Sequence, residues 1–138
     1  MALASDAKNR QDELREQLRR KYVGEILKRV DEFYEYVQRG DAVQASEKIY
    51  RAAEEFVKLM AELKDIPEAR EANFAGRWTR GLLFSASEKL DLTSIFDTAD
   101  VLHVEGFHER SMSLENVRKR GKKVADEIIA RLKAEGLA

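Results

Sequence analysis

The sequence predicts an all-α protein, folded as an antiparallel bundle of four or five helices, and three observations support this class. Apolar residues recur at spacings of three and four along most of the chain, as they do on one face of an α-helix. No stretch alternates apolar and polar residues in the way a half-buried strand does. The 138 residues include one proline, so little in the chain interrupts helices.

A polar lead-in over residues 1–8 is expected to precede a single domain over residues 9–138. The first helix is predicted from about Asn9 to Arg39, roughly 45 Å at 1.5 Å per residue. Its apolar stripe is Leu14, Leu18, Tyr22, Ile26, Val30, Phe33 and Val37, and Val23, Leu27 and Tyr34 widen it. Because this helix is longer than such a bundle needs, we expect it either to supply a homodimer interface or to overhang the bundle.

The second helix is predicted to follow at once and to run to about Lys64. Gly40 is expected to end the first helix in the left-handed conformation, and Asp41 to cap the second, with Gln44 in capping-box position. Helices joined by so short a connection must lie antiparallel. The second helix is rich in alanine, which allows close helix approach, at Ala42, Ala45, Ala52 and Ala53.

The third helix is predicted from Pro67, which suits a first turn, to about Leu90. Its apolar positions are Phe74, Trp78, Leu82, Leu83 and Ala86. Gly76 and Gly81 fall inside it, and each costs about 1 kcal/mol relative to alanine in an exposed helix. We therefore expect both glycines to pack closely against another backbone.

Two further helices are predicted. Thr93 or Ser94 is expected to cap a short helix that runs to about Val104 and is broken by Gly106. Ser113 is expected to cap the last helix, which Gly136 ends. The core face of this last helix carries Leu114, Val117, Val124, Ile128 and Leu132, with Gly121 on the same face.

Composition excludes several function classes. Cysteine is absent, which rules out disulfides, thiolate catalysis and Cys-ligated zinc. No apolar run approaches a membrane span and the N-terminus lacks a secretory signal, so we expect a cytoplasmic protein with no membrane partner. The net charge of −1 gives no overall field that attracts nucleic acid. The charged fraction of 37% is typical either of a thermophilic source or simply of solvated helices.

Charge is nevertheless segregated along the chain. Residues 88–109 hold six acidic residues against one basic, and residues 110–123 hold six basic residues against one acidic. Lys119, Lys122 and Lys123 would point outward from the last helix, where they either contact phosphates or form a solvated face paired with the acidic stretch.

The only two histidines, His103 and His108, are the candidate catalytic residues. Asp97, Asp100 and His103 are spaced three residues apart, so neighbours share a helix face. A carboxylate beside an imidazole favours its charged form and suits acid–base or binding work. The same three residues resemble the start of a metal site, but they do not make a ligand set, so neither a metal nor a cofactor is predicted. The alternative is that Asp100 is a surface partner of a half-buried His103.

Two further groups are candidate binding residues. His108 and Glu109 follow Gly106, where they either bind a ligand or hydrogen-bond free carbonyls at the helix end. Arg77 and Arg80 flank Trp78, which either stacks a base or packs in the core. No phosphate-binding glycine loop and no Ser-His-Asp arrangement occurs.

Three strings together resemble the archaeal PaREP family, whose paralogues are abundant in hyperthermophilic crenarchaea. They are GDAVQASEKIY with AAE after it at 40–54, GRWT with LLF at 76–84, and LHVEGFHE at 102–109. The resemblance covers about residues 9–132. It implies a bundle like that of the HEPN (higher eukaryotes and prokaryotes nucleotide-binding) domains, which commonly dimerise and act beside nucleotidyltransferases or as ribonucleases.

The chain departs from the HEPN ribonuclease motif, in which an Arg precedes a His by roughly four to six residues. The positions at that distance hold Phe96, Asp97 and Thr98 before His103, and Val101, Leu102 and His103 before His108. Only an Arg from elsewhere, such as Arg77, Arg80 or Arg110, would replace the missing one in space.

Three functions follow as hypotheses. The favoured one is a non-catalytic, homodimeric binding module that contacts a nucleotide, an RNA or a partner protein. An antitoxin-like or structural interaction bundle is the first alternative. A metal-independent ribonuclease that uses His103 or His108 is the second, and the missing motif weighs against an enzyme.

Overall fold

The computed structural model describes the backbone of residues 2–138 and the side chains from residue 4 onward. The elements are α1 (Ala2–Leu18), the π-helix η1 (Arg19–Val23), α2 (Gly24–Gln38), α3 (Ala42–Leu63), α4 (Pro67–Ala75), α5 (Arg80–Lys89), α6 (Thr93–Val101), the π-helix η2 (Leu102–His108) and α7 (Leu114–Ala134). Strands are absent from this described range. The prediction of an all-α helical bundle is confirmed.

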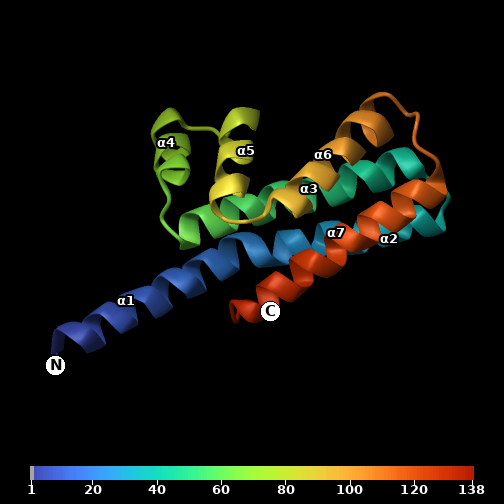
Figure 1. The fold of residues 1–138 in the computed structure, drawn as a ribbon. Coiled ribbons are helices and arrows are strands. Elements are labelled where there is room, and N and C mark those ends of the chain that lie inside the picture. Colours follow the sequence, from blue (N-terminus) through green and yellow to red (C-terminus); the bar gives the residue numbers. More distant parts are fainter. Residues whose placement is uncertain (1) are drawn as a thin grey trace.

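The first three elements form one unbroken helix, because the junction residues Leu18 and Gly24 keep right-handed helical dihedrals. It begins at Ala2, so the expected polar lead-in is helical rather than irregular. Alanine and charged residues form helices without an apolar stripe, which is why hydrophobic periodicity placed the start too late. Residues 4–13 are exposed, and Figure 1 shows α1 extending past the rest of the bundle.

Most of the wide apolar face of this long helix is used within the chain, although Tyr34 is 37% exposed. Its buried residues are Leu18, Tyr22, Val23, Ile26, Val30 and Phe33. The π-helix η1 makes this possible, because its wider turn shifts the side chains that follow relative to those before it. The helix overhangs the bundle, as one of the two alternatives predicted, and the homodimer interface stays a prediction.

Helix α3 is the centre of the bundle. It packs against α2, η2, α7 and α6, and Figure 1 shows it between the α2/α7 pair and α6. Four of its buried residues are alanines, at positions 45, 52, 53 and 61, each with 0% exposure. Three of the four alanines expected to allow close approach, Ala45, Ala52 and Ala53, are thus buried in these helix contacts, and Ala42 is half-buried.

The connection between α2 and α3 is as predicted. Gly40 has φ +75°, and the amide of Asp41 donates to the Tyr36 carbonyl at 2.9 Å, which closes a Schellman motif. The Asp41 side chain accepts from the Gln44 amide at 3.0 Å. Because the Asp41 amide is already bonded to Tyr36, the reciprocal half of the capping box is not needed.

The predicted third helix is two helices. Gly76 has φ +77° and ends α4, and the Thr79 side chain caps α5 by accepting from the Leu82 amide at 3.2 Å. The expected close packing at both glycines is wrong: nothing lies within 4 Å of a Cβ built at Gly76, and only Thr79 Oγ1 lies near one at Gly81. Phe74, in the last turn of α4, is 95% exposed and not in the core as predicted.

The predicted fourth helix extends further than expected. The N-cap position of α6 is Leu92, so neither Thr93 nor Ser94 caps it. Gly106 does not break the helix, because α6 passes into η2, which continues to His108. Gly106 is buried inside this π-helical turn, where it faces Ser46 on α3.

The last helix is largely as predicted. Ser113 Oγ accepts from the Asn116 amide at 3.2 Å, and Gly136, with φ +71°, follows the end of α7. Gly121 faces the ring of Phe33 on α2. Leu114 is the exception to the predicted core face, since it is 36% exposed in the first turn.

A buried carboxylate ties α4 to α5. Glu68 is 5% exposed, accepts from the Ser85 hydroxyl and pairs with the Lys89 ammonium at 2.9 Å. The Ser85 hydrogen bond and, next, Lys89 hold the pKa of the Glu68 carboxyl below its usual value, although burial opposes them. The contribution of the charged form to stability is present above the unfolded pKa of about 4.3 and is lost as the pH falls through the lower folded value.

We therefore expect Glu68→Gln to be less stable than the wild type at pH 7, with a difference that shrinks as the pH falls below about 4.3. Urea unfolding at a series of pH values from 7 to 3 measures this difference. Glu71→Gln is the matched control, because Glu71 is exposed on the same helix and makes no ion pair within the described residues. A difference that stays constant over this pH range would contradict the assignment.

Candidate functional site

The two histidines meet in η2. Their Nε2 atoms are 3.1 Å apart and their ring planes are 81° apart. In a π-helix the backbone hydrogen bonds join residues five apart, so side chains at that spacing lie one turn above another. The spacing from 103 to 108 becomes a contact only because this segment is a π-helix, which sequence periodicity did not predict.

His103 is held on three sides. Its ring stacks on Tyr50 of α3, with centroids 4.0 Å apart and planes 24° apart, and Phe107 lies on η2 with its ring centroid 6.0 Å away. The Nδ1 atom lies 3.5 Å from Glu47 Oε2, while the other Glu47 oxygen accepts from Arg51 at 3.0 Å. Tyr50 and Glu47 had no signal in the sequence, because they lie more than fifty residues from His103 along the chain.

Several buried polar atoms at and around His103 have no hydrogen-bond partner. In the described part of the chain, every buried side-chain nitrogen or oxygen without a hydrogen bond belongs to Glu47, Asp100 or His103. Native proteins leave few such atoms, and they concentrate at functional sites. Burial, and then the nearby carboxylates of Glu54 and Asp100, raise the pKa of Tyr50. We call Glu47, Tyr50, Asp100, His103 and His108 the histidine cluster.

Asp100 is the only predicted acidic partner that joins this cluster. It pairs with Arg80 at 2.6 Å, and the Arg80 guanidinium lies 5.4 Å from the centre of the Phe84 ring. Asp97 is exposed, and no group of three His or carboxylate side chains in the described range is placed to hold a metal ion. Arg80 therefore lies beside the histidine cluster, where an arginine replacing the one missing from the ribonuclease motif would have to lie. Its guanidinium is already paired with Asp100.

The end of η2 is capped by backbone groups and by Ser111, and not by the side chains of His108 and Glu109. The Glu109 amide donates to the Val104 carbonyl at 2.8 Å, and the Ser111 amide and hydroxyl both donate to the Glu105 carbonyl, at 2.9 Å and 3.2 Å. The His108 ring is bonded to His103 instead, and both His108 and Glu109 are exposed.

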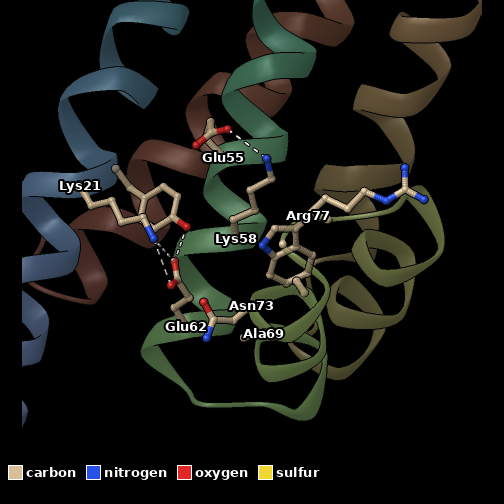
Figure 2. A pocket seen from close by; sticks show the side chains of 11 residues that line it. Lys21, Glu55, Lys58, Glu62, Ala69, Asn73 and Arg77 are labelled. Carbon is tan, nitrogen blue, oxygen red and sulfur yellow. Dashed lines mark hydrogen bonds and ion pairs between the residues drawn. The ribbon is translucent and has the colours of Figure 1, made fainter.

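A second candidate site is a cleft of about 340 Å³ between η1, α3 and the α4–α5 connection. Figure 2 shows Lys21 and Glu62 facing each other across one side of it and Lys58 at its back. Lys21 Nζ lies 3.3 Å from Glu62, which also accepts from the Tyr22 hydroxyl, and Lys58 Nζ lies 3.3 Å from Glu55. Burial, and then the Glu62 hydrogen bond, raise the pKa of Tyr22.

Two of the predicted binding residues line this cleft. Trp78 is half-buried in the wall, and Arg77 makes no ion pair among the described residues. Figure 2 shows the Arg77 side chain extending away from the Glu62 side of the cleft. The lining carries three basic residues, Lys21, Lys58 and Arg77, against the two acidic residues Glu55 and Glu62, so it is positive by one charge. Lys21, Lys58 and Glu62 had no signal in the sequence because they lie on η1 and α3, whereas Trp78 lies in the connection between α4 and α5.

The basic residues of α7 form a third, separate group. Lys119, Lys122 and Lys123 are exposed, as predicted. Lys122 pairs with Asp126 at 2.7 Å and Arg118 pairs with Glu115, so the ion pairs are made within α7. The expected pairing of this face with the acidic stretch over residues 88–109 is wrong, because acidic residues one turn away on the same helix are closer partners.

The strings that resembled a family are the segments that build these sites. The α3 string supplies Glu47 and Tyr50, the second string supplies the Trp78 wall, and the third is η2 with its histidines. A family model described as the archaeal PaREP1/PaREP8 family matches residues 21–128. The chain belongs to this family.

A solved structure supports the same conclusion. The chain resembles a protein of Sulfolobus solfataricus known from a crystal structure, with 35% sequence identity and a TM-score of 0.71. The match covers 79% of this PaREP chain and 94% of the Sulfolobus protein. No curated protein matches the sequence. In the described part of the chain, no helix combines the length and the apolar character needed to cross a membrane.

Proposed function

We propose that this PaREP protein is a binding module that holds a nucleotide in the cleft beside Trp78. The observation that carries the proposal is the combination of the single tryptophan with Lys21, Lys58 and the unpaired Arg77 around one hollow. An indole face stacks any nucleobase, and lysine and arginine bind phosphate. The volume of about 340 Å³ lies in the range of small-ligand sites.

The charges in the cleft favour a small ligand over a long polyanion. Lys21 and Lys58 each face a glutamate, so the lining is positive by only one charge, and the chain as a whole has a net charge of −1. Binding along a phosphate backbone needs several unpaired cations in a row. Arg77 adjoins Trp78 in the chain and makes no ion pair among the described residues, but its side chain extends away from the Glu62 side of the cleft, so its guanidinium would have to turn inward to meet a phosphate beside a stacked base.

Intrinsic fluorescence tests this proposal directly, because Trp78 is the only tryptophan in the chain. We expect AMP, GMP, CMP or UMP to quench its emission saturably at low salt. Arg77→Gln and Lys58→Gln should each weaken binding by about tenfold, the loss of one charge-assisted contact. Lys122→Gln is the matched control, since it removes a lysine of α7 outside the cleft and should leave binding unchanged.

Two outcomes would replace this proposal. Emission unchanged by every nucleotide, together with a tightly bound protein that co-purifies with the chain, would favour the antitoxin-like interaction bundle. Cleavage of labelled single-stranded RNA in EDTA, lost in the His103→Ala/His108→Ala double variant, would favour the metal-independent ribonuclease, for which the meeting of the two histidines is the supporting observation. Light scattering on the same samples measures the oligomeric state, for which we propose a homodimer.

A further inference from the structure

The π-helical turn of η2 brings two imidazole nitrogens to within 3.1 Å of each other near its surface. We propose that His103 Nε2 and His108 Nε2 form a two-histidine site for a divalent transition-metal ion of the Zn²⁺, Ni²⁺ and Cu²⁺ class. This inference uses none of the residues of the nucleotide cleft, so the two proposals stand or fall separately.

The spacing of the two nitrogens matches that of two imidazole ligands on one metal ion. Imidazole nitrogens lie about 2.0–2.1 Å from such a metal ion, so two of them at 90–110° about the ion are about 2.9–3.4 Å apart. The observed separation of 3.1 Å falls within this range. Without a metal, the same distance is held by a hydrogen bond in which one Nε2–H donates to the other ring.

A carboxylate also lies beside the other ring nitrogen of His103. A histidine that binds a metal through one nitrogen usually donates its other N–H to a carboxylate, which fixes the tautomer and orients the ring. His103 Nδ1 faces Glu47 Oε2 at 3.5 Å, and both atoms are buried without another partner. A proton on Nδ1 leaves the Nε2 lone pair free on the His108 side. Arg51 holds the other oxygen of Glu47, so the carboxylate is already oriented for this contact.

Access and charge also suit a cation. The His103 side chain is 24% exposed, and His108 lies exposed at the end of η2. Glu47 faces His103 and is also bonded to Arg51, Asp100 is paired with Arg80, and Glu105 and Glu109 in and just after η2 add two exposed acidic residues. Imidazole ligands select zinc, nickel and copper over magnesium and calcium, which prefer oxygen.

The ligand set is incomplete on the protein side. No third histidine or carboxylate in the described range is placed to complete it. Water would fill the remaining positions, so the site is open and its ion is exchangeable. Because binding would join the two ends of one helical turn, the metal should stabilise the folded chain by mass action.

Isothermal titration of the full chain with Zn²⁺, Ni²⁺, Cu²⁺ and Mg²⁺ at pH 7.5 tests the site. We expect one ion bound per chain for each transition metal, no binding of Mg²⁺, and a rise in melting temperature with the bound ion. His108→Gln should abolish saturation over the range in which the wild type saturates. Glu47→Gln should weaken binding by about 10- to 100-fold, as removal of an orienting carboxylate does elsewhere. Glu54→Gln, about two turns further along α3, is the matched control and should bind like the wild type.

Three results would overturn the proposal. These are the absence of saturable binding, binding that survives His108→Gln, and binding unaffected by Glu47→Gln, which would mark an adventitious ion on a surface imidazole. Melting curves without metal show whether each variant is folded. The His103 and His108 ring resonances, followed by NMR during the Zn²⁺ titration, give an independent readout, because both rings should shift together with the same saturation.

Discussion

Replacing Gly121 with alanine should lower the free energy of unfolding by about 1–3 kcal/mol, the cost of adding a methyl group to a full core. A Cβ at this position would come well inside 3.0 Å of the ring carbons of Phe33. That ring cannot move aside, because Phe33 is 0% exposed and lies where α2 and α7 cross. Alanine has the higher helix propensity by about 1 kcal/mol, but the steric conflict outweighs it.

The chain provides a matched control for Gly121→Ala. Gly24 also lies in a helix with right-handed dihedrals, and nothing lies within 4 Å of a Cβ built there. Gly24→Ala should therefore stabilise the protein by about 0.5–1 kcal/mol. Urea unfolding of both variants measures the contrast. A neutral or stabilising Gly121→Ala would show that α2 and α7 are not packed as closely as described.

A second substitution separates the clash from other effects of Gly121→Ala. Phe33→Leu removes the ring that the new methyl group meets, at the cost of a partly filled cavity. In the double variant, the added penalty of Gly121→Ala should be smaller than in the wild-type background, and a double-mutant cycle gives the coupling. Additive penalties would indicate that the ring is not the obstacle.

Gly106→Ala should also lower the free energy of unfolding by about 1–3 kcal/mol, and it should disturb the histidine cluster. Its Cβ would come within 3.0 Å of both Cβ and Oγ of Ser46. Ser46 is fully buried in α3, and its hydroxyl donates to the Ala42 carbonyl at 2.8 Å, so it cannot swing away without losing that bond. The π-helix would have to lift away from α3, and His103 would lose its stacking on Tyr50.

A second substitution, on α3, should relieve the clash that Gly106→Ala creates. Ser46→Gly removes both atoms that the new side chain meets, although a glycine in α3 costs about 1 kcal/mol. We expect Gly106→Ala combined with Ser46→Gly to be more stable than the sum of the single changes predicts. Urea unfolding gives the energies, and the Zn²⁺ titration of the same variants reports on the position of His103. Gly106→Ala with unchanged stability would refute the close contact between η2 and α3.

The helix boundaries predicted best from sequence are those set by a capping residue or by a glycine in the left-handed conformation. Gly40 with Asp41, Ser113 and Gly136 all act as predicted, because a cap depends on backbone groups within a few residues of it. The helix end at Gly76 was not predicted. A glycine costs about 1 kcal/mol inside a helix and also ends helices, and hydrophobic spacing continued past it, so the break after Ala75 was missed.

The candidate sites were only partly predictable. Sequence analysis identified Trp78, Arg77, Asp100 and both histidines, since rare or charged residues beside apolar runs attract attention without any knowledge of the fold. Their partners were not found. Glu47 and Tyr50 reach His103, and Lys21 and Lys58 reach the Trp78 cleft, across helix–helix contacts that have no local signature.

The sequence by itself determined the helical class, the order of the helices, most of their ends and the PaREP resemblance, because these depend on residue type and short-range spacing. Only the tertiary structure decided which polar residues meet. The two π-helices are the clearest case: an extra residue in a turn is tolerated where packing against α3 compensates for it. That packing energy comes from residues distant in the chain, so the pairing of His103 with His108 arises from the assembled bundle and not from the local sequence.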